Sequence, residues 1–365
     1  MTPFTLGVEE EYLIVDAETA ELRPRAERIL APAGESLGDH VQNELSLSQI
    51  EVETEICTTL EEVRTELVRL RKELMSAAEQ AGSRIAATGT HPFTDWLGQA
   101  ITPKKRYLDM AEEYRLVAWQ QLICGCHVHV GLDDPEAAIQ VMDRCRPWLP
   151  VLLALSANSP FWQGIDTGFD SFRIQLWERW PMSGTPGVFG SRAAYDALVE
   201  ELIATGSVPE ATRLYWDVRP SARFPTLEFR IADVCLTVDE TVMVTGLSRS
   251  LARTCQRQAL AGEPVPELRS ELVRAARWRA SRYGLDGELI DLRAHEAAPA
   301  ATVVGRFLEF LRPDLEESGE WAEVSARVQR TLQTGNGARR QRRVFQETGS
   351  LRAVMDWVLG ETATG

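Results

Sequence analysis

The chain contains 365 residues with a formal net charge of −15 at pH 7, and 44% of its residues are hydrophobic while 25% are charged. These values are typical of a globular protein with a large core, and they fit one α+β domain or two smaller domains. The acidic balance argues against nucleic acid as the main partner, because phosphate backbones are bound by lysine- and arginine-rich surfaces. Charges interrupt every apolar stretch before it reaches membrane-spanning length, so we expect no membrane partner, and the first residues carry no secretory signal.

Cysteine usage bears on the cellular compartment. The six cysteines are spread along the chain without a CxxC pair. Cys124 and Cys126 are two residues apart on one predicted strand, where a disulfide between them would be strained. The same spacing does not suit a zinc site. We therefore expect free thiols in a reducing cytoplasm.

The first half of the chain alternates between strand and helix patterns. Thr59 and Glu62 form a capping-box sequence, in which each side chain can bond the other residue's backbone N–H at the start of a helix. Apolar residues at helical spacing follow, and Gly82 favours the end of that helix. We expect strands over residues 4–15, 48–57, 84–88 and 122–132, and helices over residues 59–81, 105–121, 135–146 and 151–157.

The second half begins with a segment of different character. Residues 159–191 are rich in glycine, proline and aromatic residues, and a loop of that length inside a compact domain is usually functional, so we interpret it as a substrate lid or wall. We find no internal repeat and no linker, so residues 1–365 are expected to form one domain. We expect helices over residues 192–205 and 237–260, paired strands over residues 213–219 and 225–234, and an almost entirely helical portion from about residue 267 with breaks at Gly284, Pro299, Pro313 and Gly335.

Four of the predicted strands carry charged or imidazole side chains at alternate positions. Alternate residues of a strand point to the same face, so each strand would have one apolar face and one charged face. A face with so many carboxylates repels itself unless solvent or cations neutralise it, and hard divalent cations prefer oxygen ligands. We therefore predict an antiparallel sheet backed by helices, a Mg²⁺ or Mn²⁺ site on its charged face, and phosphoryl-transfer chemistry. The charged faces would carry Glu9 and Glu11, then Glu51, Glu53 and Glu55, then His127 and His129, and finally Glu228 and Arg230.

Not every residue on these faces needs to bind metal. A solvated strand face explains Glu53 as well as the catalytic role that we assign to it. His127 and His129 lie between Gly125 and Gly131, and glycines in a strand allow a ligand to approach closely. We assign His127 to the metal and His129 to the substrate, and the spacing alone leaves open which of the two histidines binds the metal. The predicted metal ligands are Glu9, Glu11, Glu51, His127 and Glu228.

Three arginines and one tryptophan are candidates for contacts with substrates. Arg219 and Arg230 lie on the paired strands near the acidic face, and arginine binds phosphate or carboxylate in a bidentate manner. A simple ion pair with Glu228 is the alternative explanation, and we favour a catalytic role for Arg230. Arg173 and Trp177 lie in the aromatic segment and are assigned to substrate binding, against the alternatives of an exposed loop arginine and a packed tryptophan.

Nine segments carry a likeness to a known family, and they extend from residue 5 to about residue 345. They are TLGVEEEYLIVD, QIEVETEICTTLEEV, GTHPF, ICGCHVHVGL, LLALSANSPFWQGIDTGFDSFR, WERWPMSG, WDVRPSARFPTLEFRIADV, RYGLDGELID and GNGARRQRRVF. On these motifs the chain resembles the carboxylate–amine ligases of the type 2 glutamate–cysteine ligase family, especially its bacterial glutamate–cysteine ligase 2 subgroup. No single segment is specific, but together they cover nearly the whole chain.

The resemblance implies a glutamine synthetase-like fold, in which an antiparallel sheet forms a metal-lined funnel. It implies ATP-dependent chemistry, in which the γ-carboxylate of glutamate takes the γ-phosphoryl group of ATP and the amine of cysteine then displaces phosphate. By motif, the predicted metal ligands match those of the family and Arg230 matches an arginine that contacts phosphate, so we assign Arg219 and Arg230 to ATP binding. The partners would be small molecules, an amino-acid carboxylate and an amine, and the relationship suggests a homodimer.

Several alternatives stay open at this point. Differences from the family pattern within FDSFRIQLWERWPMSGTPGVFG leave room for another acid or another amine on the same scaffold. A guanidino kinase on a related fold would give a phosphorylated product and no amide. A His-x-His pair can also begin a zinc amidohydrolase site, but that mechanism needs several more histidines, and only His40, His91 and His295 remain. A non-catalytic metal- or nucleotide-binding protein is the third class, and ATP turnover that depends on both an acid and an amine would exclude it.

Overall fold

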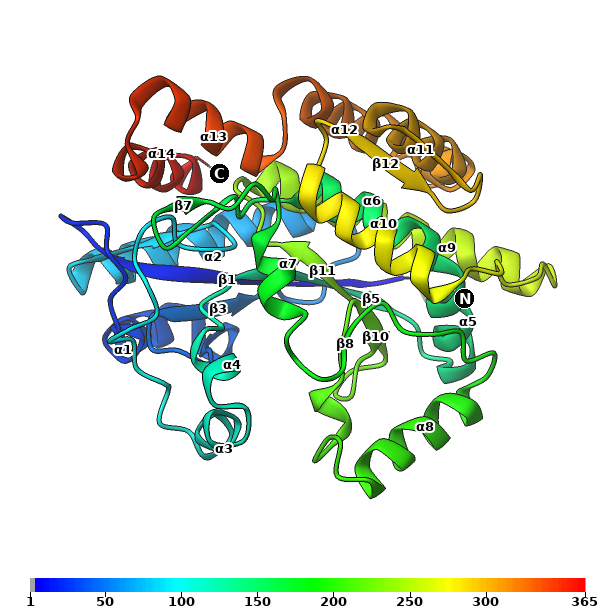
Figure 1. Ribbon diagram of the computed structural model, residues 1–365, viewed down its shortest axis with the longest axis horizontal. Coiled ribbons are helices and arrows are strands. Elements are labelled where there is room, and N and C mark those ends of the chain that lie inside the picture. Colours follow the sequence, from blue (N-terminus) through cyan, green and yellow to red (C-terminus); the bar gives the residue numbers. More distant parts are fainter. Residues whose placement is uncertain (1–3, 365) are drawn as a thin grey trace.

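A seven-stranded antiparallel sheet forms the centre of the computed structural model, which describes residues 4–364 (Figure 1). The strand order is β10-β11-β5-β1-β3-β2, and β4 pairs with the last residues of β1. The prediction of an α+β fold with an antiparallel sheet is thereby confirmed. The strands are β1 (Leu6–Asp16), β2 (Val41–Asn43), β3 (Gln49–Glu53), β4 (Ser83–Ala86), β5 (Gly125–Gly131), β10 (Val218–Pro220) and β11 (Thr226–Asp233).

The long strand β1 organises the sheet because it pairs with three other strands. Its first half pairs with β5 and places Glu9 opposite His127, while its middle pairs with β3 and places Glu11 opposite Glu51. The other edge of β5 pairs with β11 in a register that aligns their charged faces as well. Directly opposite residues of an antiparallel pair point to the same face. The registers therefore gather the predicted charged side chains on one face of the sheet.

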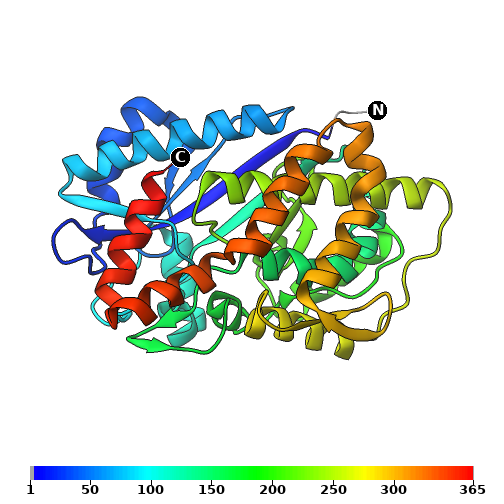
Figure 2. The same ribbon diagram turned by 90° about the horizontal axis from the view of Figure 1, so that it is seen from above.

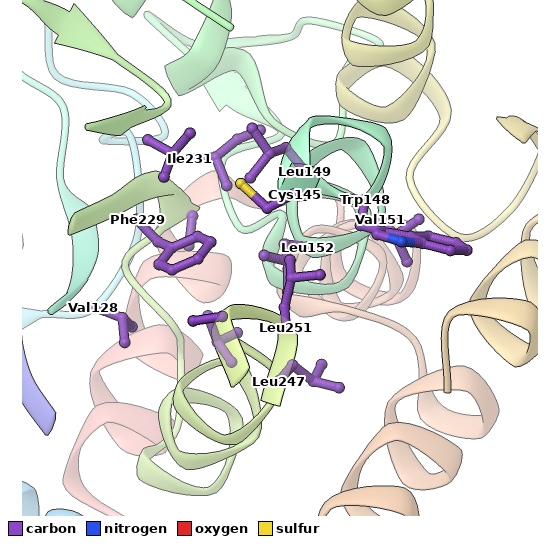
Figure 3. Packing of buried hydrophobic residues seen from close by; sticks show 14 of the residues in the cluster. Val128, Cys145, Trp148, Leu149, Val151, Leu152, Phe229, Ile231, Leu247 and Leu251 are labelled. Carbon is purple, nitrogen blue, oxygen red and sulfur yellow. The ribbon is translucent and has the colours of Figure 1, made fainter. Parts of the chain in front are cut away.

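The opposite face of the sheet is apolar and packs against helices. Val128 of β5 and Phe229 of β11 contact a cluster that includes Leu152, Leu247 and Leu251 from two of these helices (Figure 3). The first view shows these helices on one side of the sheet (Figure 1). They are α2 (Leu60–Gln80), α5 (Pro135–Cys145), α6 (Leu149–Ser156) and α9 (Val238–Leu260).

Capping boxes begin the two longest of these helices, as the sequence predicts. The Thr59 hydroxyl accepts a bond from Glu62 N at 3.1 Å, and the Glu62 carboxylate accepts one from Thr59 N at 3.2 Å. Thr237 and Glu240 make the same reciprocal pair at the start of α9. Each pair satisfies backbone donors that have no partner within the helix.

One ion pair lies inside the apolar layer. Glu10 and Arg71 are 0% and 2% exposed, and Arg71 donates to both oxygens of Glu10 at 2.6 and 3.0 Å. Arg71 also donates to the carbonyls of Cys235 and Leu236 at 3.0 Å, and the Thr241 hydroxyl donates to Glu10 at 2.6 Å. These bonds tie β1 to α2 and to the start of α9. Removing one member of such a buried pair typically costs about 3–5 kcal/mol.

The C-terminal portion forms a second helical layer (Figure 2). Its predicted helical character is confirmed, with two differences. A short hairpin that ends at Pro299 interrupts the helices. Pro313 lies inside a helix that continues past it, because a helix can accommodate a proline at the cost of one backbone hydrogen bond. The elements are α10 (Ser270–Tyr283), β12 (Glu288–Asp291), β13 (Glu296–Pro299), α11 (Ala300–Glu317), α12 (Trp321–Thr334), α13 (Gly337–Thr348) and α14 (Leu351–Ala363).

Residues 159–191 are more regular than the sequence suggests. They contain a hairpin, a short helix capped by the Ser171 hydroxyl, and a strand that pairs in parallel with residues 215–216. Their composition does not reveal this, because each element is only a few residues long. The elements are β6 (Phe161–Trp162), β7 (Ile165–Asp166), α7 (Phe172–Trp177), β8 (Ser183–Gly184) and β9 (Tyr215–Trp216).

Several other bounds differ from the expected ones. β3 ends at Glu53, although we expected the strand to reach residue 57, and Ile56 beyond its end is 78% exposed. The helix expected over residues 105–121 is divided at Arg115, whose φ is 49°, a left-handed value that a helix cannot contain. The remaining helices are α1 (Ala26–Leu37), which we did not predict, α3 (Lys105–Tyr114), α4 (Leu116–Trp119), α8 (Arg192–Ala204) and the 3₁₀ turns Gly38–His40, Arg146–Trp148 and Ala211–Arg213.

Two predictions, one about membrane spans and one about disulfides, can be compared with the described residues. No helix among residues 4–364 is long and apolar enough to cross a membrane. All six cysteines are buried free thiols. The expected absence of disulfides agrees with this arrangement.

Candidate active site

The charged face of the sheet forms the floor of a cavity of about 180 Å³. Side chains of β1, β3, β5 and β11 form the floor, and residues near β2, on α3, at the end of α7 and in the β10–β11 turn form the walls. The alternating pattern in the sequence therefore predicted which side chains gather at this cavity. The predicted residues that line the cavity are Glu9, Glu11, Glu51, Glu53, His127, His129, Trp177, Arg219, Glu228 and Arg230.

Glu9 lies between the two histidines. Its oxygens lie 2.8 Å from Nδ1 of His127 and 3.1 Å from Nε2 of His129. The other nitrogen of His129 lies 2.8 Å from the Thr226 hydroxyl, which fixes the orientation of that ring. Nε2 of His127 is buried and has no hydrogen-bond partner among the described residues, and its nearest carboxylate, that of Glu11, is 3.8 Å away. A buried ring nitrogen without a partner is a free position for a ligand.

Two groups of three side chains could each hold a cation, and both include Glu9. In each group, the ligand atoms lie within 4.8 Å of one another. The first group is Glu9, Glu51 and His127, and the second is Glu9, His129 and Glu228. Carboxylate oxygens with a minority of imidazole nitrogens suit Mg²⁺ or Mn²⁺, so the residues present fit the predicted ion.

The pKa values of Glu11 and Glu51 are both raised. Glu11 belongs to neither group, and it accepts a 2.6 Å bond from Gly125 N. Burial raises the pKa of Glu11 to about 7. Burial also raises the pKa of Glu51 well above its ordinary value, with the charges of Glu9 and Glu44 adding to the effect. Such repulsion between buried carboxylates is relieved when a cation binds among them.

The pKa values of the two other candidate carboxylate ligands are shifted in the opposite direction, below their ordinary values. Burial opposes the ionisation of Glu9, but hydrogen bonds from His127 and His129 hold its pKa well below the ordinary value. Burial likewise opposes the ionisation of Glu228, and the charges of Arg230 and Arg219 lower its pKa. Both carboxylates are therefore anionic and ready to bind a cation at neutral pH.

Two of the arginines that line the cavity flank Glu228. Arg219 Nε lies 3.0 Å from the carboxylate, and Arg219 Nη1 donates to the Leu214 carbonyl at 2.6 Å. Arg230 forms an ion pair with the other oxygen of Glu228, and its guanidinium lies 5.5 Å from the centre of the Trp177 ring. Both arginines therefore make the ion pair with Glu228 and also face the cavity, and their binding of phosphate stays a prediction.

Aromatic residues form one wall above the charged floor. Trp177 donates to the Tyr215 carbonyl at 3.0 Å, and the rings of Trp180 and Tyr215 lie 5.0 Å apart. Tyr107 of α3 lines the cavity from another element. Trp177 lines the cavity, and the neighbouring Trp180 lines it as well. Substrate binding by Trp177 stays a prediction.

One assigned residue, Arg173, occupies a place that we did not expect, whereas Glu53 lines the cavity with the other predicted residues. Arg173 is 1% exposed and does not line the cavity, and its guanidinium lies against Gly125 of β5. This placement does not support contact with a substrate carboxylate. Glu53 lies at the cavity edge opposite Glu9, whereas Glu55 lies beyond the end of β3, where it pairs with His40 at 3.0 Å.

Sequence reasoning did not identify several residues of the cavity. Gln49 shares the β3 face with Glu51, so the alternation itself could have identified it. Glu44 follows the three-residue strand β2, and Arg106 and Arg223 lie in segments that carry no alternation. Only the folded arrangement brings these residues to the site.

A pocket in which carboxylates and imidazoles offer cation ligands beside arginines is the arrangement found in enzymes that transfer phosphoryl groups. A model of the glutamate-cysteine ligase family 2 matches residues 5–356, and the chain belongs to that family. A Frankia alni protein named "Putative glutamate--cysteine ligase 2-2" is 45% identical, over 99% of this chain and 97% of the relative. A Rhodopirellula baltica protein named "Putative glutamate--cysteine ligase 2" is 40% identical, over 98% of this chain and 96% of the relative. The predicted family and the predicted class, an ATP-dependent carboxylate–amine ligase, are thereby confirmed.

Solved structures share the fold at much lower identity. The crystal structure of glutamate–cysteine ligase from Francisella tularensis in complex with AMP has a TM-score of 0.75 and 11% identity, over 100% of this chain and 90% of that one. A bifunctional glutathione synthetase from Pasteurella multocida has a TM-score of 0.73 and 16% identity, over 99% of this chain. This chain spans 52% of the bifunctional protein, about half its length. These likenesses show the fold alone, and they agree with the predicted glutamine synthetase-like ligase fold.

Proposed function

We propose that this protein joins the γ-carboxylate of glutamate to the amine of cysteine through an acyl phosphate, with ATP as the phosphoryl donor and Mg²⁺ or Mn²⁺ as cofactor. The observation that carries the proposal is the pair of ligand groups that share Glu9, with Arg230 beside them on the same face. Neighbouring cation positions next to an arginine suit a polyphosphate and the group that it transfers.

The metal ligands in this proposal come mainly from four adjacent strands. Glu9, Glu51 and His127 would hold one cation, while His129 and Glu228 would share Glu9 around a second. When bound, the cations neutralise the phosphates of ATP and the charge that develops on the transferred group. Rigid strands suit this task because they hold each ligand at a fixed register.

In the first step, an oxygen of the γ-carboxylate bonds to the γ-phosphorus of ATP, and the bond between that phosphorus and the ADP oxygen breaks. Arg230 donates to the transferring group, because its buried guanidinium faces the cavity and is held by Glu228 and Trp177. Arg219 contacts the nucleotide phosphates from the other side of Glu228. These roles give both arginines the ATP-binding function assigned from the sequence.

In the second step, the amine nitrogen bonds to the acyl carbon, the carbon–oxygen bond to phosphate breaks, and the nitrogen loses a proton. Glu53 is placed to accept that proton, because it is partly exposed at the cavity edge opposite Glu9. Burial and the charge of Glu9 raise the pKa of Glu53, which makes it a better base than an ordinary glutamate. His129, which the sequence assigned to substrate binding, serves in this proposal as a ligand of the second cation and does not contact the amine.

An acyl phosphate must be kept from water until the amine arrives. Trp177, Trp180 and Tyr215 form an apolar wall over the charged floor, and their mutual ring contacts keep that wall closed. Trp177 therefore contributes to substrate binding by covering the reacting groups rather than by a polar bond.

ADP release by the purified protein tests the proposal. The assay contains Mg²⁺, ATP and glutamate, with and without cysteine, and mass spectrometry identifies the products. We expect cysteine-dependent ADP together with the mass of γ-glutamylcysteine. A phosphorylated substrate without an amide would identify a kinase instead, and no turnover with any acid and amine would contradict the ligase proposal.

The same assay examines other substrates of the same chemistry. Acids and amines are exchanged one at a time while ADP is measured. Amide formation with a different pair would keep the mechanism and change the substrate. A zinc hydrolase is not favoured, because His91 is buried against the Ala20 carbonyl and, among the described residues, neither it, His40 nor His295 lines the cavity.

Compartment and assembly stay predictions. Six buried free thiols suit the reducing cytoplasm that we expect. The expected homodimer can be measured by light scattering during size-exclusion chromatography. A mass of one chain would contradict it.

A further inference from the structure

Helix α7 carries two side chains that bear on Arg230. Arg173 and Trp177 are four residues apart, so they lie on the same face of α7. The guanidinium carbons of Arg173 and Arg230 each lie 5.5 Å from the centre of the Trp177 ring. Arg173 itself is fully buried and does not reach the cavity.

Arg230 lies in an irregular part of its strand. The register between β11 and β5 shifts between Phe229 and Ala232. Within that shift, Arg230 N donates to the Asp217 carbonyl at 2.8 Å, and the Arg230 carbonyl accepts a long bond of 3.5 Å from Arg173 Nη2. Strand irregularities of this kind re-aim a side chain and are frequent next to active sites. Arg173 thus contacts the backbone at the point where the direction of Arg230 is decided.

Space for Arg173 comes from the glycine opposite. A Cβ added at Gly125 would lie 2.2 Å from Arg173 Nη2, a distance that real Cβ contacts do not show. Gly125 N also donates at 2.6 Å to Glu11, which lines the cavity, so the same residue of β5 bonds to a cavity side chain and leaves space for Arg173. Any side chain at this position would force the guanidinium of Arg173 to move, and glycine leaves the space in which it lies.

The hydrogen bonds and ion pairs of Arg173 do not account for the burial of its charge. Its Nε and Nη1 atoms are buried and have no hydrogen-bond partner among the described residues. Its nearest carboxylate, Asp233, is 3.9 Å away and already accepts bonds from Asn158 N and from the hydroxyls of Ser159 and Ser171. A buried arginine with so few bonds adds little to stability, because its loss of hydration is poorly compensated.

We propose that Arg173 is a positioning residue, which sets the direction of Arg230 through the strand irregularity and the shared Trp177 ring and does not touch substrate. The inference rests on the proposed function, in which Arg230 contacts the transferring phosphoryl group. It replaces the substrate-binding role that the sequence suggested for Arg173.

Steady-state kinetics of Arg173→Met distinguish positioning from substrate binding. We expect kcat to fall on the order of 100-fold, the loss typical of a reacting group displaced by about 1 Å, while KM for ATP and glutamate changes by less than about threefold. The matched control is Arg249→Met, because Arg249 is equally buried at 1% but bonds to Thr58 and Glu320 away from the cavity. The control should lower the melting temperature and leave kcat of the folded protein within about twofold.

Arg173→Met with an unchanged kcat, or with a raised KM for glutamate at full kcat, would overturn the inference. An inactive wild-type protein would instead count against the proposed function. Crystal structures of the wild type and Arg173→Met then test the inference without turnover. The ion pair between Arg230 and Glu228 should be displaced in the variant, and an unchanged Arg230 would refute the role of Arg173.

A double-mutant cycle with Gly125→Ala provides a second, independent test. The added methyl group should displace the guanidinium and lower kcat by at least about tenfold, whereas it should fit the space vacated in Gly125→Ala/Arg173→Met. The double variant should therefore be no slower than Arg173→Met alone. If the kcat losses of the two single variants multiply in the double variant, the inference is contradicted. A Gly125→Ala protein with full kcat would contradict it as well. Gly125→Ala keeps the test decisive even if Arg173→Met fails to fold.

Discussion

Neighbouring carboxylates on the two faces of β1 have opposite surroundings. Glu10 points into the core, where Arg71 donates to both of its oxygens and Thr241 adds a third bond. Glu9 and Glu11 point into the cavity, where they face other carboxylates and an imidazole nitrogen without a partner. The residues are adjacent in sequence and identical in type, so only the surroundings separate them.

This contrast separates a structural carboxylate from a functional one. A buried carboxylate whose bonds are all satisfied by the protein holds elements together. Buried carboxylates that raise one another's pKa have too little positive charge around them, and a bound cation supplies that charge. The following predictions test the two halves of the contrast.

Glu51→Gln should produce the largest effect on activity. The change removes a ligand of the first cation group but keeps the side-chain volume, so turnover should fall on the order of 10³-fold. The melting temperature should stay the same or rise, because burial and neighbouring charges raise the pKa of Glu51 in the absence of metal. Turnover assays and thermal unfolding check the two parts, and full activity would contradict the role of Glu51.

Glu10→Gln should show the reverse behaviour. The substitution leaves Arg71 buried without its carboxylate, which should lower the free energy of unfolding by about 3–5 kcal/mol. Activity per folded molecule should change little, because Glu10 lies on the face away from the cavity. Denaturant unfolding measures the loss. A stability equal to that of the wild type would show that the ion pair is not structural.

Divalent cations should stabilise the folded protein. At a concentration of about 100 times its Kd, a ligand that binds only the folded state adds about 2.7 kcal/mol. Mg²⁺ or Mn²⁺ should therefore raise the melting temperature of the wild type in the absence of ATP. The rise should be much smaller in Glu51→Gln, and equal shifts in the two proteins would place the binding elsewhere.

A second comparison concerns two buried histidines. Burial lowers the pKa of both His91 and His127 to about 4. His91 uses both ring nitrogens within the protein, with Nε2 at 2.9 Å from the Ala20 carbonyl and Nδ1 at 2.9 Å from Thr94 N. His127 keeps one nitrogen free. By this criterion His91 is structural, whereas His127 offers a position for a ligand.

His91 predicts a pH dependence of stability. Its pKa in the folded state lies below the value of 6.5 expected when unfolded, so the unfolded chain binds more protons and stability is lost as pH falls from 6.5 towards 4. Between pH 7 and pH 4.5 this group should cost about 2–3 kcal/mol. The wild type should lose that much more stability than His91→Gln in denaturant unfolding at the two pH values. Parallel losses would show that His91 does not titrate in this way.

The alternating charged residues made the site predictable, because a period of two survives in the sequence wherever a strand has one buried face. Glu9, Glu51, His127 and Glu228 were identified in this way, and the sheet followed from them. Gln49 continues the same pattern and was missed only because it carries no charge.

The other residues could not be read from local patterns. The partner of Glu10 is 61 positions away in α2, so nothing near it in the sequence indicates that it is paired. Glu44 follows a strand of only three residues, which is too short to show alternation. Arg173 was expected in a loop, because a six-residue helix leaves no detectable periodicity.

The most direct test of the central claim follows oxygen from glutamate to phosphate. Glutamate labelled with ¹⁸O in its γ-carboxylate is incubated with the protein, Mg²⁺, ATP and cysteine, and the released phosphate is examined by mass spectrometry. An acyl phosphate requires that one labelled oxygen leave with the phosphate when the amine displaces it. We predict one ¹⁸O atom in each phosphate released, and amide formation with unlabelled phosphate would contradict the proposed mechanism.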